Sequence, residues 1–333
     1  MHAEPITKGD LVKLTKGLMT EAEAREKLEH IRWPEGVRCV FCNSDQVGRT
    51  VSKASVRKDG RSIPERHLFN CRTCKKQFSV TKGLIFEDSK IPLTTWINVM
   101  YRMCSSKRGI SAYQIMREYG LKYEAAWFML HRIRWGMNDK SPTPLMGVVE
   151  ADETYVGGKP RGHIEERRAT MTQSERIKVA SDKKVQVFGM LERGGRVRAQ
   201  ALTQKGERIT KRDVQATLAA NIDTKNAKLM TDEYSYYVGM DARLPHGVIR
   251  HKSEYVRGAV HTQGIESFWS ILKRGLIGTY YHVDAAYLGQ YVQEFAFRHN
   301  TRHISDAERF TTLMSQVSGR VDWYLGRNAK GVS

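Results

Sequence analysis

The sequence predicts an α/β protein in which a mixed-sheet core follows two smaller N-terminal modules. From Leu145 onward, apolar runs with strand character alternate with amphipathic helical segments, which is typical of an α/β domain. Residues 92–139 show helical periodicity alone, and two Cys-x-x-Cys pairs precede them. These three observations predict an N-terminal helix and metal-binding ribbon (1–90), a helical region (91–141), the α/β core (142–310) and a C-terminal tail (311–333).

Composition narrows the class of partner. The 333 residues carry a formal net charge of +19, which favours a polyanionic partner, with nucleic acid as the leading candidate. No apolar run approaches the ~18 residues that a membrane span requires, and the N-terminal residues lack the apolar core of a signal peptide. We therefore expect a cytoplasmic, nucleoid-associated protein with no membrane partner.

The N-terminal region contains a helix followed by a metal-binding pattern. Residues 20–32 are expected to form a short helix that Thr20 caps. Two Cys-x-x-Cys knuckles then supply four thiolates, which suit one structural tetrahedral zinc ion and leave no open coordination position. The basic segment between the knuckles, turn-prone at Asp59-Gly60, predicts a hairpin. The fifth cysteine, Cys104, is expected to be a buried apolar residue. The predicted zinc ligands are Cys39, Cys42, Cys71 and Cys74.

Two amphipathic helices joined by a short turn predict a helix-turn-helix. The first ends at Gly120, and the second begins near Lys122. Pro142 and Pro144 then mark a linker. The alternative is an ordinary helical hairpin with a solvated basic face. The candidates for DNA contact from the second helix are Lys122, Tyr123, Arg132 and Arg134.

The core begins with three strands, the second and third forming a hairpin around Gly194-Gly195. A helix that Thr210 caps follows, then the short buried strand AKLMTD, and another possible strand in the run GVIRHKSEYV. Two helical segments close the core, IESFWSILKRGLIG and AAYLGQYVQEFAFRHNTR. We expect the order strand, strand, strand, helix, strand, helix, strand, helix, which matches the ribonuclease H-like fold.

Three acidic residues lie where this core could gather them. Asp152 lies in the first strand, Asp232 ends a short apolar strand, and Glu266 begins a helix. The C-terminal ends of strands are where α/β sheets place their sites. Carboxylate oxygens suit Mg²⁺ or Mn²⁺, and a pair of such ions can make and break phosphodiester bonds without a protein nucleophile. The alternative for any one of these carboxylates is a solvated surface acid.

Neighbouring residues leave some roles open. Because strand side chains alternate, Glu150 should point with Asp152, as a supporting or rim acid, while Glu153 points the opposite way. Glu233 competes with its neighbour as a ligand. Trp269, Ser270 and Lys273 recur on one helical face with Glu266. Lys273 lies about 10 Å along the helix from Glu266 and is expected to meet a phosphate.

With these residues in view, the chain resembles the zinc-ribbon DDE transposases of bacterial insertion sequences, the group whose third acid is followed seven residues later by a lysine. The most specific matches are DETYVGGK and IESFWSILKR. Further matches lie in RWPEGVRCVFC, FNCRTCKKQFSVTKGLIF, YEAAWFMLHRIR, LMTDEYSYY and YVQEFAFRHNTR, and together they span about residues 20–310. The family often has Asn where this chain has Gln263.

The resemblance implies that Asp152, Asp232 and Glu266 are the catalytic acids, that Lys273 is the associated basic residue and that the four cysteines hold zinc. It also implies two Mg²⁺ or Mn²⁺ ions, binding of terminal inverted repeats, strand cleavage, and strand transfer into target DNA by a homo-oligomer, a dimer or larger. The spacing, with 79 residues between the first two acids and 33 between the last two, fits an uninterrupted ribonuclease H-like core. Two alternatives are a non-catalytic DNA-binding regulator and a nuclease of this fold without strand transfer.

Overall fold

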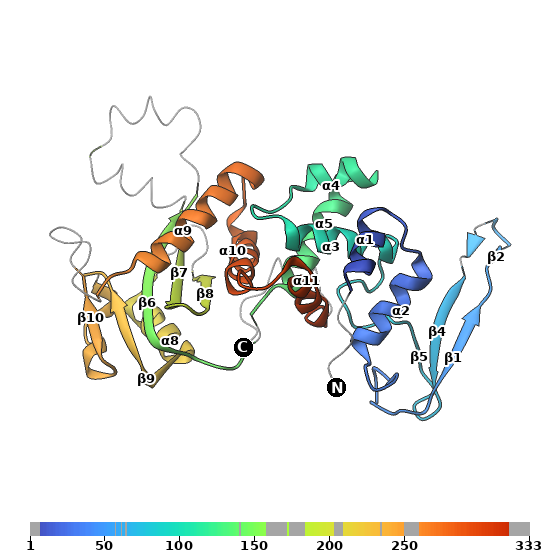
Figure 1. Ribbon diagram of the computed structural model, residues 1–333, viewed down its shortest axis with the longest axis horizontal. Helices are drawn as coiled ribbons and strands as arrows, with labels where there is room; N and C mark the ends of the chain where they lie inside the picture. Colours follow the sequence, from blue (N-terminus) through green and yellow to red (C-terminus); the bar gives the residue numbers. More distant parts are fainter. Residues whose placement is uncertain are drawn as a thin grey trace. The chain divides into compact units, whose positions relative to one another are not determined.

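The computed structural model describes residues 7–56, 58–60, 62–63, 65–139, 141–157, 172, 184–202, 209–233, 235–249 and 260–319. The chain forms two compact units (Figure 1). Unit 1 comprises residues 1–106, 112–136 and 304–333, and unit 2 comprises residues 107–111 and 137–303. The ribbon, the helical region and part of the expected tail thus share unit 1. Among the described residues, no helix has the length and apolarity to cross a membrane.

Unit 1 joins a small antiparallel sheet to a group of helices. Thr20 caps the expected helix over residues 21–32, since its hydroxyl accepts a hydrogen bond from the backbone N–H of Glu23 at 3.2 Å. The expected hairpin around Asp59-Gly60 is also present. The elements are α1 (Lys8–Thr15), α2 (Glu21–Arg32), β1 (Val47–Ser52), β2 (Ser55–Val56), β3 (Ser62–Ile63), β4 (Arg66–Cys71), β5 (Gln77–Phe78), α3 (Leu93–Ser105), α4 (Ala112–Tyr119), α5 (Tyr123–Gly136) and α11 (Asp306–Ser315).

In unit 1, α1, α2 and α11 pack against α3, and α4 packs against α5. α4 and α5 are the two helices expected for a helix-turn-helix, with a short turn at Gly120. The C-terminal helix α11 packs against α3, where the rings of Tyr101 and Phe310 lie 5.7 Å apart. Cys104 is 1% exposed, so it is the buried apolar residue expected.

Unit 2 contains a five-stranded mixed sheet in the order β10-β9-β6-β7-β8. β6 pairs antiparallel with β7 and parallel with β9, and β9 pairs parallel with β10. The first strand of the unit, β6, is therefore the central strand of the sheet, with an antiparallel neighbour on one side and a parallel neighbour on the other. This is the ribonuclease H-like topology, as expected. The elements are β6 (Leu145–Val156), β7 (Val185–Glu192), β8 (Val197–Ala201), α8 (Lys211–Asn221), β9 (Ile222–Thr231), η1 (Ser235–Tyr237), η2 (Met240–Ala242), β10 (His246–Val248), α9 (Gln263–Gly275), the π-helical turn η3 (Leu276–Tyr280) and α10 (Ala285–Asn300).

The sheet of unit 2 has an apolar layer on each face. One layer joins β7 and β8 to α9 and α10, and the other joins β6 and β9 to α8 and the η1–η2 segment. The expected order differs from the structure at two places. The segment between β9 and β10 forms two short 3-10 turns where that order has a helix, and two helices, α9 and α10, follow β10 where it has one. The strand expected in GVIRHKSEYV is present as β10, and its residues 250–256 lie outside the described part.

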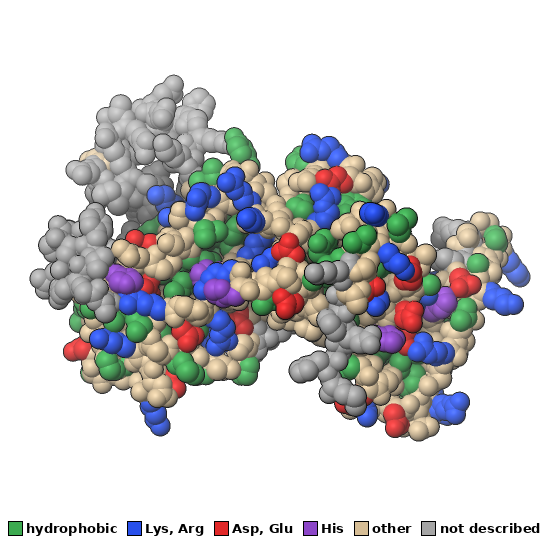
Figure 2. All heavy atoms as spheres, viewed as in Figure 1, with side chains coloured by type: hydrophobic (Ala, Val, Ile, Leu, Met, Phe, Trp, Pro, Cys, Tyr) green, Lys and Arg blue, Asp and Glu red, His purple; other side chains and the backbone are tan. Residues whose placement is uncertain are grey.

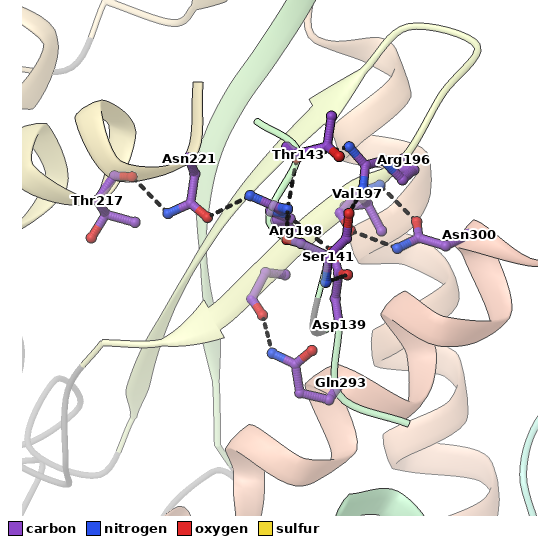
Figure 3. Close-up of polar contacts among 11 residues, drawn as sticks. Asp139, Ser141, Thr143, Arg196, Val197, Arg198, Thr217, Asn221, Gln293 and Asn300 are labelled. Atoms are coloured by element: carbon purple, nitrogen blue, oxygen red, sulfur yellow. Dashed lines mark hydrogen bonds and ion pairs between the residues drawn. The ribbon is translucent and has the colours of Figure 1, made fainter. Parts of the chain in front are cut away.

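The edge strand β8 is covered by side chains rather than by another strand (Figure 3). The Asn300 amide accepts from the backbone N–H of Val197 at 2.7 Å and donates to its carbonyl at 3.0 Å. Gln293 donates to the carbonyl of Ala199 at 2.9 Å. Because an uncovered edge can pair with another chain, these α10 amides limit edge-to-edge association at β8.

The linker that enters β6 is also fixed to this edge. Arg198 forms an ion pair with Asp139 at 3.2 Å and donates to the carbonyls of Ser141 and Thr143 (Figure 3). Arg196 donates to the Ser141 hydroxyl at 2.8 Å. The start of the strand that carries Asp152 is therefore fixed within unit 2.

Candidate functional site

The four cysteines of the ribbon form a compact cluster. The Sγ atoms of Cys39, Cys42, Cys71 and Cys74 all lie within 4.8 Å of one another. Those of Cys39 and Cys74 are 3.6 Å apart, as are those of Cys42 and Cys71. Four thiolates around zinc at about 2.3 Å would be separated by roughly 3.8 Å, so the cluster fits a tetrahedral zinc ion.

Backbone donors around the cluster favour the thiolate form. The N–H of Cys74 donates to the Cys71 sulfur at 3.4 Å, and this hydrogen bond lowers the pKa of the Cys71 thiol to about 6. The N–H of Phe41 donates likewise to Cys39 at 3.4 Å. Since zinc binds thiolates, these donors support a structural metal site.

The three predicted acids come from three elements of unit 2. Asp152 lies near the C-terminal end of β6, Asp232 directly follows β9, and Glu266 lies in the first turn of α9. β6 and β9 are parallel neighbours, so their C-terminal ends lie at the same edge of the sheet. Within the described residues, the four cysteines alone form a group of three or more ligand atoms as close as 4.8 Å, so the carboxylates are less tightly gathered.

The acids nevertheless interact electrostatically. Burial raises the pKa of Asp152, the negative charges of Asp232 and Glu266 raise it further, and the result is about 6. The indole N–H of Trp269 opposes this by donating to Oδ2 of Asp152 at 3.0 Å. The Thr262 hydroxyl donates to Oε1 of Glu266 at 2.8 Å. A cation would relieve the mutual repulsion of these carboxylates.

Glu150 and Asp152 point to the α9 side of the sheet, as the alternation predicts. Glu150 has no exposed surface, and its Oε1 accepts from Nε of Arg193 at 2.7 Å. Its Oε2 accepts from the backbone N–H of Ile265, near the start of α9, at 3.0 Å. Glu150 is therefore a buried acid that contacts the helix of Glu266, not an acid at the rim.

Glu153 points the opposite way, towards the α8 side. Its Oε1 accepts from the hydroxyl of Tyr237 in η1 at 2.9 Å. Burial raises the pKa of Glu153 to about 8, with further contributions from the charges of Asp152 and Asp232. Tyr237 itself is 2% exposed, so the hydrogen bond is buried. It joins β6 to the segment that follows Asp232.

The outer face of α9 is polar and partly basic. Glu266, Ser270 and Lys273 are exposed, whereas Trp269 is buried against the sheet rather than sharing their surface. Figure 2 shows several Lys and Arg side chains over the C-terminal part of this helix, and the last turn contains Lys273 and Arg274.

The candidate DNA contacts on α5 divide into two pairs. Lys122 and Tyr123 are exposed at its start. Arg132 donates to the backbone carbonyls of Ile85 and Glu87, and Arg134 is only 1% exposed. Arg134 is buried and Arg132 is bonded to backbone carbonyls, so Lys122 and Tyr123 are the two candidates that the structure exposes at the surface.

Motif reasoning missed the contacts that support the acids. Trp269 and Tyr237 lie in matched segments, but no pattern in the sequence indicated their hydrogen bonds to the acids, the contacts of Arg193 or the burial of Glu150. The available signal was a pair of glycines, since a Cβ at Gly189 would lie 2.6 Å from the Trp269 ring, and one at Gly264 would lie 2.8 Å from the Glu150 carboxylate.

Comparison with known proteins assigns both regions. Residues 144–300 match the ISXO2-like transposase domain, and residues 19–77 match the transposase zinc-ribbon domain. An uncharacterized protein in transposable element ISH50 of Halobacterium salinarum is 26% identical over 308 residues, which cover 90% of this chain and 97% of that protein. The zinc-ribbon match contains the cysteine cluster, and the transposase-domain match contains the three acids. The chain therefore contains a transposase zinc-ribbon domain followed by a transposase domain of the DDE class, as the resemblance to insertion-sequence transposases implies.

Proposed function

We propose that this protein binds the terminal inverted repeats of an insertion sequence, cleaves DNA strands at the element's ends and joins the freed 3′-hydroxyls to target DNA. The observation that carries the proposal is the arrangement of three acids of a transposase domain: Asp152 and Asp232 lie on or next to the parallel neighbours β6 and β9, and α9, which carries Glu266, is hydrogen-bonded to Asp152 through Trp269. Burial and the charges of Asp232 and Glu266 raise the pKa of Asp152, as expected where carboxylates share a divalent cation site.

The three acids would hold a pair of Mg²⁺ or Mn²⁺ ions. All of their ligand atoms are hard oxygens, which suits these cations. When bound, the ions supply activation of a water or 3′-hydroxyl and stabilisation of the leaving oxygen. The protein's own part is to orient the carboxylates, through the hydrogen bonds from Trp269 to Asp152 and from Thr262 to Glu266.

DNA would contact basic residues of both units. Lys273, exposed in the last turn of α9, would bind a backbone phosphate on the same helix as Glu266. Lys122 and Tyr123 at the start of α5 would contribute contacts to the terminal repeat. Bringing two element ends together requires at least two copies, so the active form is a homo-oligomer on DNA.

The test separates cleavage from binding. Asp152→Asn, Asp232→Asn and Glu266→Gln preserve side-chain shape but remove the charge that holds the cations. We expect each variant to lose cleavage of a terminal-repeat duplex by about a thousandfold or more, as expected when a metal ligand is lost, while its affinity for the same duplex stays within a few-fold. Gel-based cleavage and fluorescence anisotropy measure the two quantities, and unchanged cleavage in all three would reject the assignment.

A matched control and a second assay distinguish the alternatives. Glu233→Gln removes an exposed acid next to Asp232 and should keep cleavage near the wild-type rate. Binding without cleavage in the wild type, at any Mg²⁺ or Mn²⁺ concentration, would favour a non-catalytic regulator. Cleavage without product joining in a plasmid integration assay would favour a nuclease.

A further inference from the structure

The start of α9 lacks the side-chain cap that other helices of the chain have. Its N-cap residue, Thr262, forms no capping hydrogen bond, and its hydroxyl donates to Glu266 instead. In contrast, Thr210 caps α8 through the backbone N–H of Asp213. Unsatisfied N–H groups at a helix start need an acceptor, particularly where they are buried.

Glu150 of the sheet supplies that acceptor. Its Oε2 accepts from the N–H of Ile265 at 3.0 Å, and its negative charge lies at the positive end of the helix dipole. Arg193, which directly follows β7, balances the negative charge of Glu150, because its Nε lies 2.7 Å from Oε1 of that carboxylate. Arg193 also donates to the carbonyl of His261 at 2.8 Å. One buried carboxylate therefore joins β6, the segment after β7 and the residues that lead into α9.

Trp269 makes the second connection between α9 and β6. It lies three residues after Glu266, is 4% exposed, and donates its indole N–H to Oδ2 of Asp152 at 3.0 Å. The ring lies over Gly189, which pairs with Asp152 across β6 and β7. A Cβ at Gly189 would lie 2.6 Å from the ring, so the glycine is what allows the indole to reach the carboxylate.

These contacts are made by residues that lie close in sequence to Asp152 and Glu266. Glu150 precedes Asp152 by two residues on the same face of β6, and Ile265 directly precedes Glu266 on α9. Gly264 permits the first contact, since a Cβ there would lie 2.8 Å from the Glu150 carboxylate. Both connections fix α9 against the strand at the positions where Asp152 and Glu266 must approach the same ions.

We propose that Glu150 and Trp269 are positioning residues, which set the orientation of Asp152 and the placement of Glu266 without touching metal or DNA. The inference rests on the proposed function to the extent that these acids bind divalent cations. Glu150 is unsuited to be a ligand itself, because it is fully buried and each of its oxygens accepts a hydrogen bond within the protein. A ligand that is oriented in advance binds its ion without a reorganisation cost.

The experiment measures cation binding independently of catalysis. Trp269→Phe keeps an aromatic ring over Gly189 but removes the N–H donor, and Glu150→Gln keeps an acceptor for Ile265 while removing the charge that faces Arg193. With the ribbon zinc retained, Mn²⁺ is titrated and the rise in melting temperature is followed, in parallel with cleavage. We expect the half-maximal Mn²⁺ concentration to rise about tenfold in both assays for each variant, the effect of a lost outer contact to a metal ligand, with affinity for terminal-repeat DNA unchanged.

Trp96→Phe is the matched control. It removes a similar buried indole hydrogen bond, to the Ser89 hydroxyl at 2.9 Å, in unit 1, whereas the acids belong to unit 2, and it should leave the Mn²⁺ midpoint unchanged. If Glu150→Gln fails to fold, Trp269→Phe alone decides the matter. The proposal would be overturned if Trp269→Phe had a lower melting temperature but an unchanged Mn²⁺ midpoint. It would also be overturned if Mn²⁺ did not change the melting temperature of the wild type. A wild type that cleaves nothing, but whose Mn²⁺ response is weakened by Trp269→Phe, would reject the proposed function and support the positioning role.

Discussion

The zinc ribbon and the acidic site are both groups of metal-ligand side chains, yet they are assembled in opposite ways. In the ribbon, two short Cys-x-x-Cys knuckles bring four sulfurs within 4.8 Å of one another, and backbone N–H groups stabilise the thiolates. The acidic site draws one residue from each of three elements, and burial, together with the charges of Asp232 and Glu266, raises the pKa of Asp152.

The two sites differ in their contribution to the stability of the fold. The ribbon packs around a small aromatic group, Trp33, Phe69 and Phe78, so its metal would contribute folding free energy directly. The acidic site belongs to a sheet with an apolar layer on each face, so it folds without metal, and its crowded negative charges reduce stability. Removing a ligand should therefore destabilise the first site and stabilise the second.

The largest effect is expected at the ribbon. Cys71→Ser removes the thiolate that the Cys74 N–H supports, and structural zinc sites contribute on the order of 10 kcal/mol to folding. Zinc content should fall from about one ion per chain to none, and the β1–β4–β5 sheet should lose its hydrogen-exchange protection. Elemental analysis and hydrogen exchange by mass spectrometry measure these two changes.

Cys104→Ser is the control for that experiment, because Cys104 is buried in α3 and lies outside the cluster. It should cost some stability but keep the zinc. A Cys71→Ser protein that retains its full zinc content would show that the ion has a different ligand set.

The sequence was sufficient to predict the ribbon because every feature needed is local. The spacing of Cys39, Cys42, Cys71 and Cys74 specifies the ligands, and Asp59-Gly60 specifies the hairpin turn. The core strands and helices were likewise predictable from periodicity. The helix expected between β9 and β10 was wrong, because a short segment packed on α8 forms 3-10 turns with no amphipathic period to identify them.

The second effect is a gain of stability on removing an acid. The pKa of Asp152 rises from 3.8 to about 6, so the folded protein holds this proton more tightly than the unfolded chain does. Stability from this group is therefore present at low pH and is lost as pH rises from about 4 through 6. Roughly two pKa units correspond to about 2–3 kcal/mol. Without Mg²⁺ or Mn²⁺, Asp152→Asn should be more stable than the wild type by about 2 kcal/mol at pH 8, and the difference should vanish near pH 4.

Urea denaturation at several pH values measures this difference. Asp241→Asn, which removes an exposed acid in η2, is the control and should show no such gain. Adding Mn²⁺ should stabilise the wild type and leave Asp152→Asn unaffected. An Asp152→Asn protein that is less stable than the wild type at pH 8 would mean that the carboxylate contributes to the fold, as the cysteines do, and would remove the contrast between the two sites.

Supporting contacts were beyond sequence reasoning for a physical reason. The bonds from Ile265 to Glu150 and from Tyr237 to Glu153 join residues more than 80 positions apart, and each depends on how closely a helix or turn approaches the sheet. Alternation gave the direction of Glu150 and Glu153 but not their partners. The burial of Arg134 could not be predicted for the same reason. Helical periodicity placed this residue on α5 but did not show which residues would pack around it.

The smallest effect sharpens the contrast at the Asp232 side of the site. Tyr237→Phe removes the buried hydroxyl that donates to Glu153 at 2.9 Å and should cost about 1–2 kcal/mol, the usual loss when a buried hydrogen bond is broken. Because that bond lowers the pKa of Glu153, its removal should move this pKa further above about 8. Urea denaturation measures the stability, and the Mn²⁺ midpoint should shift upward by a few-fold, since the η1 segment after Asp232 loses its connection to β6.

Tyr236→Phe is the matched control for that shift. The neighbouring hydroxyl donates to the carbonyl of Ile209 at 2.9 Å rather than to an acid, so its loss should lower stability by a similar amount and leave the Mn²⁺ midpoint in place. Equal midpoints for the two variants would mean that Asp232 is held by β9 alone. A shift confined to Tyr237→Phe would mean that β6 has two roles: it provides Asp152, and through Glu153 it fixes the segment that follows Asp232. The knuckles of the ribbon need no such contact with a distant part of the chain.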